Sequence, residues 1–575
     1  MSGTTVGRVV TLAGSVGSWQ QLIDAGHLAA RIPGVIGVVN RLEVKGGPPS
    51  GVGASPPPLG QPFLEGAPER WLRRWSKPRR YDVVVIGAGV IGAAISRDLS
   101  RYCLRVALVE KEWDVATGAS SANNGMVHPG VNATPGSLKA RLNVRGSALY
   151  AEVAAELGVS FERCGLIGCV LNEGDRDALS RVAHRASTNR VPGFRVITPA
   201  EALAREPEIS DEIVAAFHAP SAGIISPYKL TIAYTENAVA NGVDLLLGVL
   251  TTGIRTVDGR VVGIDTNRGP IDASFVVNAA GLYADVLAES AGGRDFTIHP
   301  RRGQNLIFDR KVAGRVGSCL SILTANETPF SKGSNAMPTV DGNLLWGPDA
   351  VEVPSPLDTA TSREGHRSIV DRVSQLLPRI SSGSVISSFA GLRAATYTED
   401  FVIRPAPGRE GLLNVAGIQS PGLAAAPAIA EMALALLQDM GLPMEADPAF
   451  NPRRRQGDDA GRMLGPWRQL SVSERRRLWE GNAAYGRVVC RCEGVTEGEI
   501  VNALHGPVPS LTVDAVKRRT RAGMGRCQGG FCGPKVAEII ARELGISLAA
   551  VTKKGPQSPL TAGPLDKGLL MKGLS

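Results

Sequence analysis

Aromatic residues are sparse in this 575-residue chain, and long apolar runs are missing. Phe, Trp and Tyr together make up 5% of it. The basic runs at 453–455, 475–477 and 517–521 carry no interleaved aromatics of the kind that nucleic-acid-binding modules use. We therefore expect no nucleic-acid partner, and we interpret the net charge of +9 as solvated helix faces or a patch for an acidic protein.

Signals for membrane insertion and export are also missing. No stretch approaches 18 consecutive apolar residues, so no membrane span is predicted. The first 30 residues lack a basic region followed by an apolar run, so no signal peptide is predicted. A cytoplasmic protein is expected, with peripheral contact at the inner membrane face as an addition. In a reducing compartment, the eight cysteines are better suited to metal ligation than to disulfides.

The length predicts three or four domains. Strand-like and helix-like patterns alternate through the central part of the chain, which indicates an α/β domain. Pro and Gly crowd the region before it, which indicates a flexible linker. We expect a small N-terminal module at 1–45, the linker at 46–79, the α/β domain at 80–442, a connecting segment at 443–485, a Cys-bearing unit at 486–550 and a flexible tail at 551–575.

The first 45 residues have the pattern of a small α+β module. Residues 9–16 alternate like a strand, Ser18 suits a helix N-cap, and the helix is expected to run through Ala30. The segment from Gly34 to Val44 is expected to form a second strand or a strand pair. Its Gly-Val-x-x-Val-x-Asn-x-Leu-x-Val pattern resembles part of a BON module. That family implies lipid or protein binding, and a purely structural appendage is the alternative.

A dinucleotide-binding pattern opens the α/β domain. An apolar strand at 81–86 leads into Gly87-Ala-Gly89-Val-Ile-Gly92, followed by a helix to Ser100 and a second strand ending in Glu110. The glycines permit a tight turn, close approach to a pyrophosphate and close helix packing, while the acid suits the ribose hydroxyls. The helix N-terminus favours the phosphates. The predicted contacts are Gly87, Gly89, Val90, Ile91, Gly92 and Glu110.

Three later motifs identify the nucleotide by resemblance. The loop at 117–130, the segment Val276-Val-Asn-Ala-Ala-Gly281 with Asp285, and the turn at 417–423 resemble the D-amino-acid oxidase superfamily of FAD-dependent oxidoreductases. The similarity is greatest to its glycerol-3-phosphate dehydrogenase and 2-hydroxyglutarate oxidase members. It implies FAD and a Rossmann-like FAD-binding domain with an interleaved α+β substrate domain. The further cofactor contacts it implies are Ser121, Asn123, Gly281, Gly417, Gly422 and Leu423.

Four cysteines form two close pairs near the C-terminus. The pairs are Cys490-Arg-Cys492 and Cys527-Gln-Gly-Gly-Phe-Cys532, a spacing that favours a metal site. Zinc is the alternative metal, although zinc units usually use C-x2–4-C pairs. The spacing resembles the bacterioferritin-associated ferredoxin-like domain, which implies a 2Fe-2S cluster held by these four residues.

The helices around these cysteines have recognisable ends, so a small helical domain is expected. Thr496 and Glu499 form a capping box for the first helix. Thr512 suits the cap of the second helix, which Gly523 is expected to end. Pro534 suits the first turn of a third helix, which is expected to run to about residue 544.

The substrate side is predicted from the same resemblance. His128 is expected near the flavin as a base or orienting group, and a structural histidine is the alternative. Arg393, in a Gly-Leu-Arg motif, is expected to bind a carboxylate or phosphate. Arg301 and Arg302 are interpreted as structural. Glycerol-3-phosphate dehydrogenases carry Arg and Tyr where this chain has Asn132 and Ala133, which weakens the case for phosphate recognition.

The combination of a flavin domain and a ferredoxin-like domain resembles the large subunit of anaerobic glycerol-3-phosphate dehydrogenases, which implies an FAD-dependent dehydrogenase. We expect hydride transfer from a small anionic alcohol, best matched by glycerol 3-phosphate, to FAD. Electrons are expected to leave through the 2Fe-2S cluster to an acceptor protein or quinone-linked subunit. The alternatives are a 2-hydroxy-acid or amino/imino-acid oxidase and a non-catalytic, BON-anchored redox scaffold.

Overall fold

The computed structural model describes residues 1–46, 80–325, 335–454 and 466–561. Most of the predicted linker at 46–79 and tail at 551–575 lies outside these residues, as does part of the connecting segment. The chain divides into two compact units, one holding 1–53, 79–111 and 115–454, the other 54–78, 112–114 and 455–575. We call residues 1–45 the N-terminal module and residues 80–442 the flavin domain. The predicted domain boundaries and the BON resemblance stay predictions.

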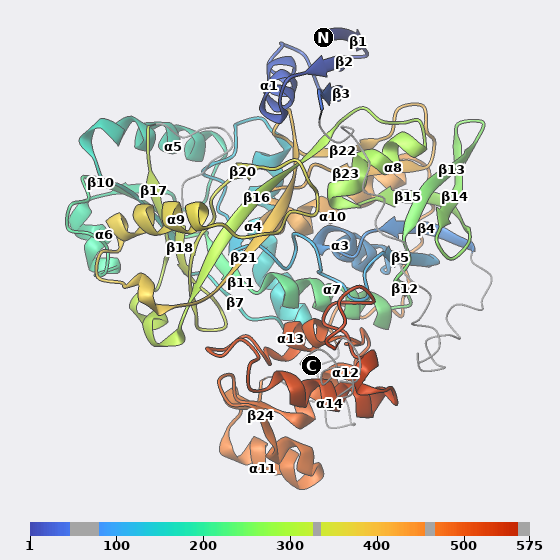
Figure 1. Cartoon of the computed structure of the whole chain (residues 1–575). Coiled ribbons are helices and arrows are strands. Elements are labelled where there is room, and N and C mark those ends of the chain that lie inside the picture. Colours follow the sequence, from blue (N-terminus) through green and yellow to red (C-terminus); the bar gives the residue numbers. More distant parts are fainter. Residues whose placement is uncertain (47–79, 326–334, 455–465, 562–575) are drawn as a thin grey trace, which may run out of the picture. The chain divides into compact units, whose positions relative to one another are not determined.

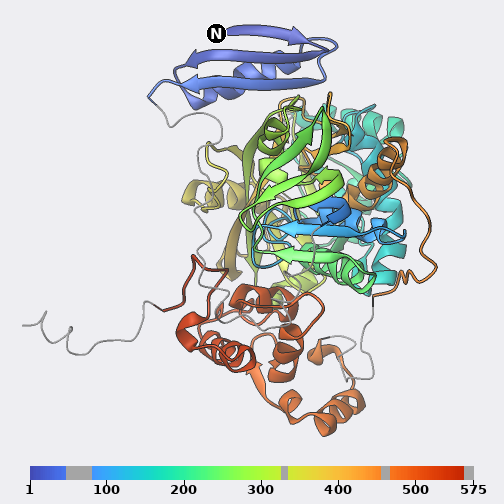
Figure 2. The same ribbon diagram turned by 90° about the vertical axis from the view of Figure 1, so that its right-hand side faces the viewer.

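The N-terminal module is a three-stranded sheet with one helix. Its elements are β1 (Ser2–Val6), β2 (Val9–Val16), α1 (Trp19–Ala30) and β3 (Gly37–Val44). Strand β2 pairs antiparallel with β1 and parallel with β3, and α1 lies against one face (Figure 2). The cap is confirmed, because the Ser18 side chain accepts the N–H of Gln21. The sequence analysis missed β1, whose five residues are all exposed and show no apolar alternation.

The first sheet of the flavin domain is the dinucleotide sheet. Its order is β12-β5-β4-β15-β14-β13, with β23 beside β15 and β22 beside β23. Pairs β12–β5, β5–β4, β4–β15 and β15–β23 are parallel, as the dinucleotide motif requires. The strands are β4 (Arg80–Ile86), β5 (Val106–Glu110), β12 (Asp244–Leu247), β13 (Thr251–Val257), β14 (Arg260–Thr266), β15 (Ile271–Asn278), β22 (Val402–Pro405) and β23 (Leu412–Ala416).

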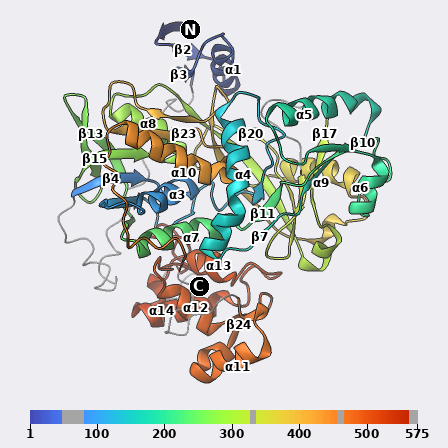
Figure 3. The same ribbon diagram turned by 180° about the vertical axis from the view of Figure 1, so that it is seen from behind.

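A helical layer packs beside this sheet. Figure 3 shows α7 (Pro227–Ala240), α3 (Val90–Leu99), α10 (Gly422–Asp439) and α4 (Leu138–Leu157), and neighbours in this order are in contact. Gly146 of α4 makes the packing close, because a Cβ there would lie 2.3 Å from the Ala424 carbonyl oxygen. By length and composition, α10 is a weak candidate for a membrane span. Because 56% of it is buried and it packs on α3 and α4, we describe it as a core helix.

The second sheet carries the substrate side. Its order is β20-β16-β19-β18-β17-β8-β10-β9, and the long β21 pairs antiparallel with β16 (Figure 1). Its strands alternate along the chain with those of the first sheet, which confirms the predicted interleaved α/β fold. They are β8 (Leu166–Val170), β9 (Arg195–Ile197), β10 (Ala215–Ala219), β16 (Ile298–Phe308), β17 (Cys319–Leu323), β18 (Asn335–Pro338), β19 (Leu344–Gly347), β20 (Val351–Glu352) and β21 (Val385–Thr396).

Short elements complete this unit. A small sheet consists of β6 (Met126–Val127), which lies within the flavin-side loop, β11 (Gly223–Ile225) and β7 (Phe161–Glu162). The second sheet buries one apolar core around Trp346 and Phe308, whose rings are 4.4 Å apart. The remaining helices are α5 (Arg176–Thr188), α6 (Pro199–Arg205), α8 (Ala284–Ser290) and α9 (Arg363–Leu376).

The C-terminal unit is small and mainly helical, as predicted. It contains α11 (Val472–Gly481), β24 (Val488–Cys490), β25 (Val495–Thr496), α12 (Glu497–Leu504), α13 (Val513–Thr520) and α14 (Gly533–Leu544). The capping box of Thr496 and Glu499 is confirmed, and so are the Thr512 cap and the position of Pro534 in the first turn of α14.

Two details of this unit correct the sequence analysis. Helix α13 ends at Thr520 and not at Gly523, because Arg521 adopts the left-handed region (φ 72°) and pairs with Glu493 at 2.8 Å. The basic run at 517–521 is also not a solvated face. Arg518 and Arg521 are buried, and Arg518 pairs with Asp114 of the same unit at 2.6 Å.

Candidate functional site

The glycine-rich turn has the geometry of a dinucleotide cradle. Gly87 has a φ of 101°, and a Cβ on Gly92 would lie 1.9 Å from the Gly87 carbonyl oxygen. Only glycine therefore permits this close turn from β4 into α3. The Glu110 carboxylate accepts the N–H of Ala88 at 2.8 Å, which fixes the acid beside the turn.

Close backbone approaches bring the distant motifs to this turn. A Cβ on Gly87 would lie 2.6 Å from the carbonyl oxygen of Ala279, in the predicted segment that ends at Gly281. A Cβ on Gly391 would lie 2.1 Å from the Ala122 carbonyl oxygen, so β21 runs directly against the flavin-side loop at 117–130. The turn at 87–92 thus lies against the segment at 276–281, and β21 lies against the flavin-side loop.

Polar side chains organise the flavin-side loop. The Ser120 hydroxyl accepts the N–H of Val90 at 2.8 Å, at the first turn of α3. Ser121 donates to the carbonyl of Gly118. The Asn123 side chain accepts the N–H of Gly125 at 2.9 Å. The sequence analysis named Ser121 but missed its neighbour Ser120, which is the serine that faces Gly89 and α3.

His128 lies directly after β6 and is partly exposed. Its carbonyl accepts the side chain of Asn143 at 2.6 Å, which fixes its backbone. Ala133 is buried, and Asn189 donates to its carbonyl at 2.9 Å. The loop after His128 is therefore held by an internal amide, and its Asn132 and Ala133 supply no cation.

The third flavin motif lies at the start of α10. Gly417 has a φ of 66°, and a Cβ there would lie 2.7 Å from the Thr396 side chain at the end of β21. Gly422 begins α10, and the Tyr150 hydroxyl of α4 donates to the carbonyl of Leu423. This turn therefore lies against both β21 and α4.

Arg393 differs from its neighbouring cations in its hydrogen-bond partners. Among the described residues, its guanidinium donates to two backbone carbonyls, those of Asp349 (3.1 Å) and Arg302 (3.4 Å). No carboxylate lies within ion-pair distance of it in the part of the chain that the structure describes. Burial, and next the charge of Arg301, lowers the pKa of Arg393 to about 10. A guanidinium with these surroundings suits an anionic ligand.

A charge network lies next to Arg393 and was not predicted. Arg301 pairs with Glu352 at 2.5 Å and with Glu399 at 2.6 Å. Glu399 also accepts the side chain of Gln419 at 2.8 Å and lies 3.9 Å from the Lys139 ammonium. Burial lowers the pKa of Lys139 to about 8.

The interpretation of the paired arginines as structural agrees with their contacts, since Arg302 also pairs with Asp358 at 2.8 Å. Sequence reasoning had no signal for Lys139 or Glu399, because both reach the network only through tertiary packing. Glu399 is held in the left-handed region (φ 56°), a conformation that persists only where surrounding contacts enforce it.

These residues fit FAD. The glycine cradle, the acid after β5 and the N-terminus of α3 supply the groups that a dinucleotide needs. The N-terminus of α10 supplies a second positive end for the flavin ring. The individual cofactor contacts stay predictions.

The four predicted cysteine ligands gather in the C-terminal unit. The sulfurs of Cys492 and Cys527 are 3.8 Å apart, the thiols of Cys490 and Cys532 hydrogen-bond each other, and none forms a disulfide. The hydrogen bond from Cys532, with backbone N–H groups of Gly523 and Glu493, lowers the pKa of Cys490 to about 6.

Backbone N–H groups of Phe531 and Gly529 likewise lower the pKa of Cys527. Only glycine fits at position 525, because a Cβ would lie 2.3 Å from that of Cys492. Thiolates surrounded by N–H donors fit a negatively charged iron–sulfur cluster.

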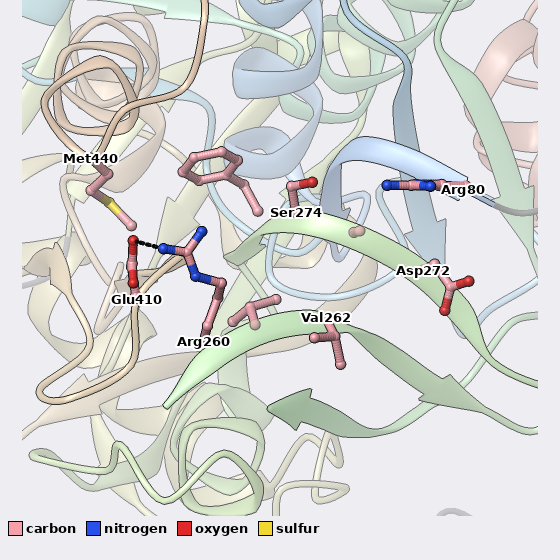
Figure 4. A pocket seen from close by; sticks show the side chains of 11 residues that line it. Arg80, Arg260, Val262, Asp272, Ser274, Glu410 and Met440 are labelled. Carbon is pink, nitrogen blue, oxygen red and sulfur yellow. Dashed lines mark hydrogen bonds and ion pairs between the residues drawn. The ribbon is translucent and has the colours of Figure 1, made fainter. Parts of the chain in front are cut away.

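An open pocket of about 360 Å³ lies elsewhere on the dinucleotide sheet (Figure 4). Arg80 and Asp272 are among the residues that line it, and Arg260, also in its lining, pairs with Glu410 at 2.6 Å. Arg80 begins β4, whereas Gly87 follows the end of that strand. The pocket is therefore at the opposite end of the strands from the dinucleotide site, and we assign no cofactor to it.

The fold and the site define a flavin-dependent oxidoreductase. Residues 82–436 match the family described as FAD dependent oxidoreductase, and the chain belongs to that family. Residues 488–542 match the BFD-like 2Fe-2S binding domain. The predicted cofactors, FAD and a 2Fe-2S cluster, are confirmed at the level of these families.

Among named relatives, the chain is similar to the glycerol 3-phosphate dehydrogenase of Caloramator mitchellensis, with 40% identity over 486 residues, 84% of this chain and 98% of that one. It is 26% identical over 500 residues to one subunit of the anaerobic glycerol-3-phosphate dehydrogenase of Escherichia coli K12, 80% and 88% of the two chains. The FAD-bound L-alpha-glycerophosphate oxidase of Mycoplasma pneumoniae superposes with a TM-score of 0.61 and 30% identity, over 65% of this chain and 98% of that one. The chain is thus a glycerol-3-phosphate dehydrogenase-like FAD oxidoreductase.

Proposed function

We propose that this enzyme oxidises glycerol 3-phosphate and that Arg393 binds the phosphate. The observation that carries the proposal is the Arg393 guanidinium, which contacts backbone carbonyls and has no carboxylate partner among the described residues. The relatives named for glycerol 3-phosphate support the choice of substrate. Arg393 takes over the phosphate contact that the residues at 132 and 133 do not offer.

His128 is the proposed proton acceptor. Oxidation of a secondary alcohol removes a hydride from carbon and a proton from the hydroxyl group. When bound, FAD supplies the acceptor for the hydride, and the 2Fe-2S cluster carries electrons one at a time. The Asn143 contact fixes the backbone that carries His128, and histidine is the side chain most often used as a general base.

The electrons are proposed to leave to a separate acceptor. Cys490, Cys492, Cys527 and Cys532 are the proposed cluster ligands. The E. coli relative is named as one subunit of its enzyme, which supports an acceptor protein or a quinone-linked partner subunit here. We propose a peripheral position at the inner membrane face, because such a partner would be membrane-bound.

The test is an assay of the purified holoenzyme with a dye acceptor and a panel of donors. Glycerol 3-phosphate is expected to reduce the dye, while glycerol and L-2-hydroxyglutarate at equal concentration are not. Oxygen in place of the dye is expected to reoxidise the enzyme slowly. Activity with L-2-hydroxyglutarate but not with glycerol 3-phosphate would contradict the proposed substrate. Rapid turnover with oxygen would show that the enzyme is an oxidase.

A further inference from the structure

Tyr397 of the flavin domain is part of the hydrophobic core of the N-terminal module. Its ring is 4% exposed and packs in one cluster with Leu22, Ile23 and Leu42 of the module. The contact with α1 is made at Gly26, where a Cβ would lie 2.4 Å from the tyrosine ring. The module's core is therefore completed by a residue that is distant in the sequence.

Hydrogen bonds fix the same tyrosine at both ends. The His27 imidazole donates from Nδ1 to the Tyr397 carbonyl at 3.2 Å, and the Asn40 side chain donates to the Tyr397 hydroxyl at 3.0 Å. The backbone N–H of Asn40 donates to Thr297 at 2.9 Å. Strand β3 passes so close that a Cβ on Gly37 would lie 2.1 Å from the Asp295 carbonyl oxygen.

Tyr397 connects the module directly to the substrate side. It follows Thr396, the last residue of β21, and Arg393 lies on the same strand. Two residues further on, Glu399 pairs with Arg301 at 2.6 Å. The next carboxylate, Asp400, accepts the N–H groups of Leu138 and Lys139 at 2.9 Å each, at the start of α4. Whatever fixes Tyr397 therefore also fixes the end of β21 and the first turn of α4.

The histidines at this contact are better explained by packing than by a metal ion. His27, His299 and Glu352 place ligand-type atoms within 4.8 Å of one another. Arg301 already pairs with Glu352 and Glu399, and Lys139 lies near Glu399, so two cations match two carboxylates. A divalent ion would add uncompensated buried charge, which is strongly unfavourable.

The rings at this contact are instead packed face to face and edge to face. His299 stacks on Tyr397 with ring centres 4.6 Å apart, and His27 meets Tyr397 edge-on at 5.3 Å. Burial is the largest effect lowering the pKa of His27 below its ordinary value, followed by the nearby His299. A close-packed joint of this kind transmits position, because close-packed interiors resist deformation.

We propose that the N-terminal module is a positioning clamp for the substrate site: by enclosing Tyr397 it fixes β21 and thereby the guanidinium of Arg393. The expected effect on kinetics rests on the proposed function, because it assumes that Arg393 binds the substrate. The contacts that form the clamp do not depend on that function. His27, Asn40 and Tyr397 are positioning residues and do not touch substrate. Loss of the clamp is expected to weaken substrate binding more than turnover, because anion binding contributes to ground state and transition state alike.

The test uses the full-length holoenzyme with Gly26→Ala, which drives a methyl group into the Tyr397 ring. Leu28→Ala on the same helix is the matched control, because Leu28 is 63% exposed. For Gly26→Ala we expect KM for glycerol 3-phosphate to rise about tenfold with kcat within about twofold, and amide exchange at 385–401 to accelerate. The control is expected to match the wild type in both measurements.

Two further arms keep the outcome clear. If Gly26→Ala fails to fold, Asn40→Leu removes only the hydrogen bonds of that side chain, and a smaller rise in KM and exchange rate is expected. If the wild type does not oxidise glycerol 3-phosphate, the proposed function fails, and amide exchange alone decides the clamp. Exchange at 385–401 that is equal in the clamp variants and in Leu28→Ala would overturn the clamp.

Discussion

Arg301 and Arg393 are register partners on the antiparallel strands β16 and β21, and they differ in one respect that decides their roles. Arg301 has two carboxylate partners, whereas Arg393 has none among the described residues. Burial of the Arg393 guanidinium and repulsion from Arg301 together lower the pKa of Arg393. The paired arginine is structural, and the other is suited to bind an anion.

Replacing Arg393 by Met is therefore expected to reduce kcat/KM for glycerol 3-phosphate at least about 100-fold, or about 2.7 kcal/mol. Steady-state kinetics with a dye acceptor checks this. Arg145→Met is the control, because Arg145 is half-exposed and pairs with Glu431 at 2.8 Å. A loss in the control as large as that in Arg393→Met would argue against a specific role for Arg393.

Glu399 is expected to make the free energy of unfolding decrease at acidic pH. Burial alone would raise the pKa of Glu399, but hydrogen bonding and charge from Arg301 lower it to about 2, below its ordinary value of 4.5. A carboxyl group whose folded pKa is depressed stabilises the fold above pH 4.5, by on the order of 3 kcal/mol, and this is lost as the pH falls towards 2.

Glu399→Gln should accordingly lower the free energy of unfolding by about 2–3 kcal/mol at pH 7, with a difference from wild type that shrinks as the pH falls from about 5 to about 3. Urea unfolding followed by circular dichroism measures both values. Glu431→Gln, at an exposed pair, is expected to change stability by less than about 1 kcal/mol. A difference that stays constant across this pH range would contradict the account.

Gly391 tests the contact between β21 and the flavin-side loop. A methyl group at this position would lie 2.1 Å from the Ala122 carbonyl oxygen, so Gly391→Ala must displace the loop. FAD binding is expected to weaken at least about tenfold, measured by flavin release during dialysis. Gly314→Ala is the control, because its new methyl group would meet open space. Wild-type flavin retention in Gly391→Ala would show that the loop does not contact the cofactor.

The cysteine site is tested by metal content. Cys492→Ser is expected to lower iron from about two atoms per chain to nearly none, because a 2Fe-2S cluster needs all four ligands. Cys103→Ser changes an exposed thiol outside the site and serves as the control, with iron content expected to match the wild type. Zinc in place of iron in the wild type would contradict the cluster assignment, and full iron in Cys492→Ser would remove that residue from the ligands.

The sequence predicted the parts of the fold that local chemistry determines. The glycine turn after β4, the Ser18 cap, the capping box of Thr496 and the proline in α14 each depend on neighbours within a few residues. The family resemblance added the three flavin motifs. The glycines in these motifs can be recognised in the sequence. The structure shows that several of them are positions where backbone segments approach each other closely.

The parts that were missed depend on contacts distant in sequence. Strand β1 is fully exposed and exists only because β2 offers an edge. Helix α13 stops early because Arg521 reaches Glu493. Arg301 pairs with Glu399, and Tyr397 is buried in the N-terminal module. Both contacts join residues far apart in the chain, and no hydrophobic periodicity in the sequence predicts them.

The central claim is that glycerol 3-phosphate is oxidised at the flavin site of this chain. Anaerobic titration of the holoenzyme with glycerol 3-phosphate, followed at the visible flavin band, measures this most directly. The account predicts that the band bleaches in wild type and that Arg393→Met needs at least about 100-fold more substrate for the same bleaching rate. A flavin band that stays oxidised in wild type at saturating glycerol 3-phosphate would contradict it.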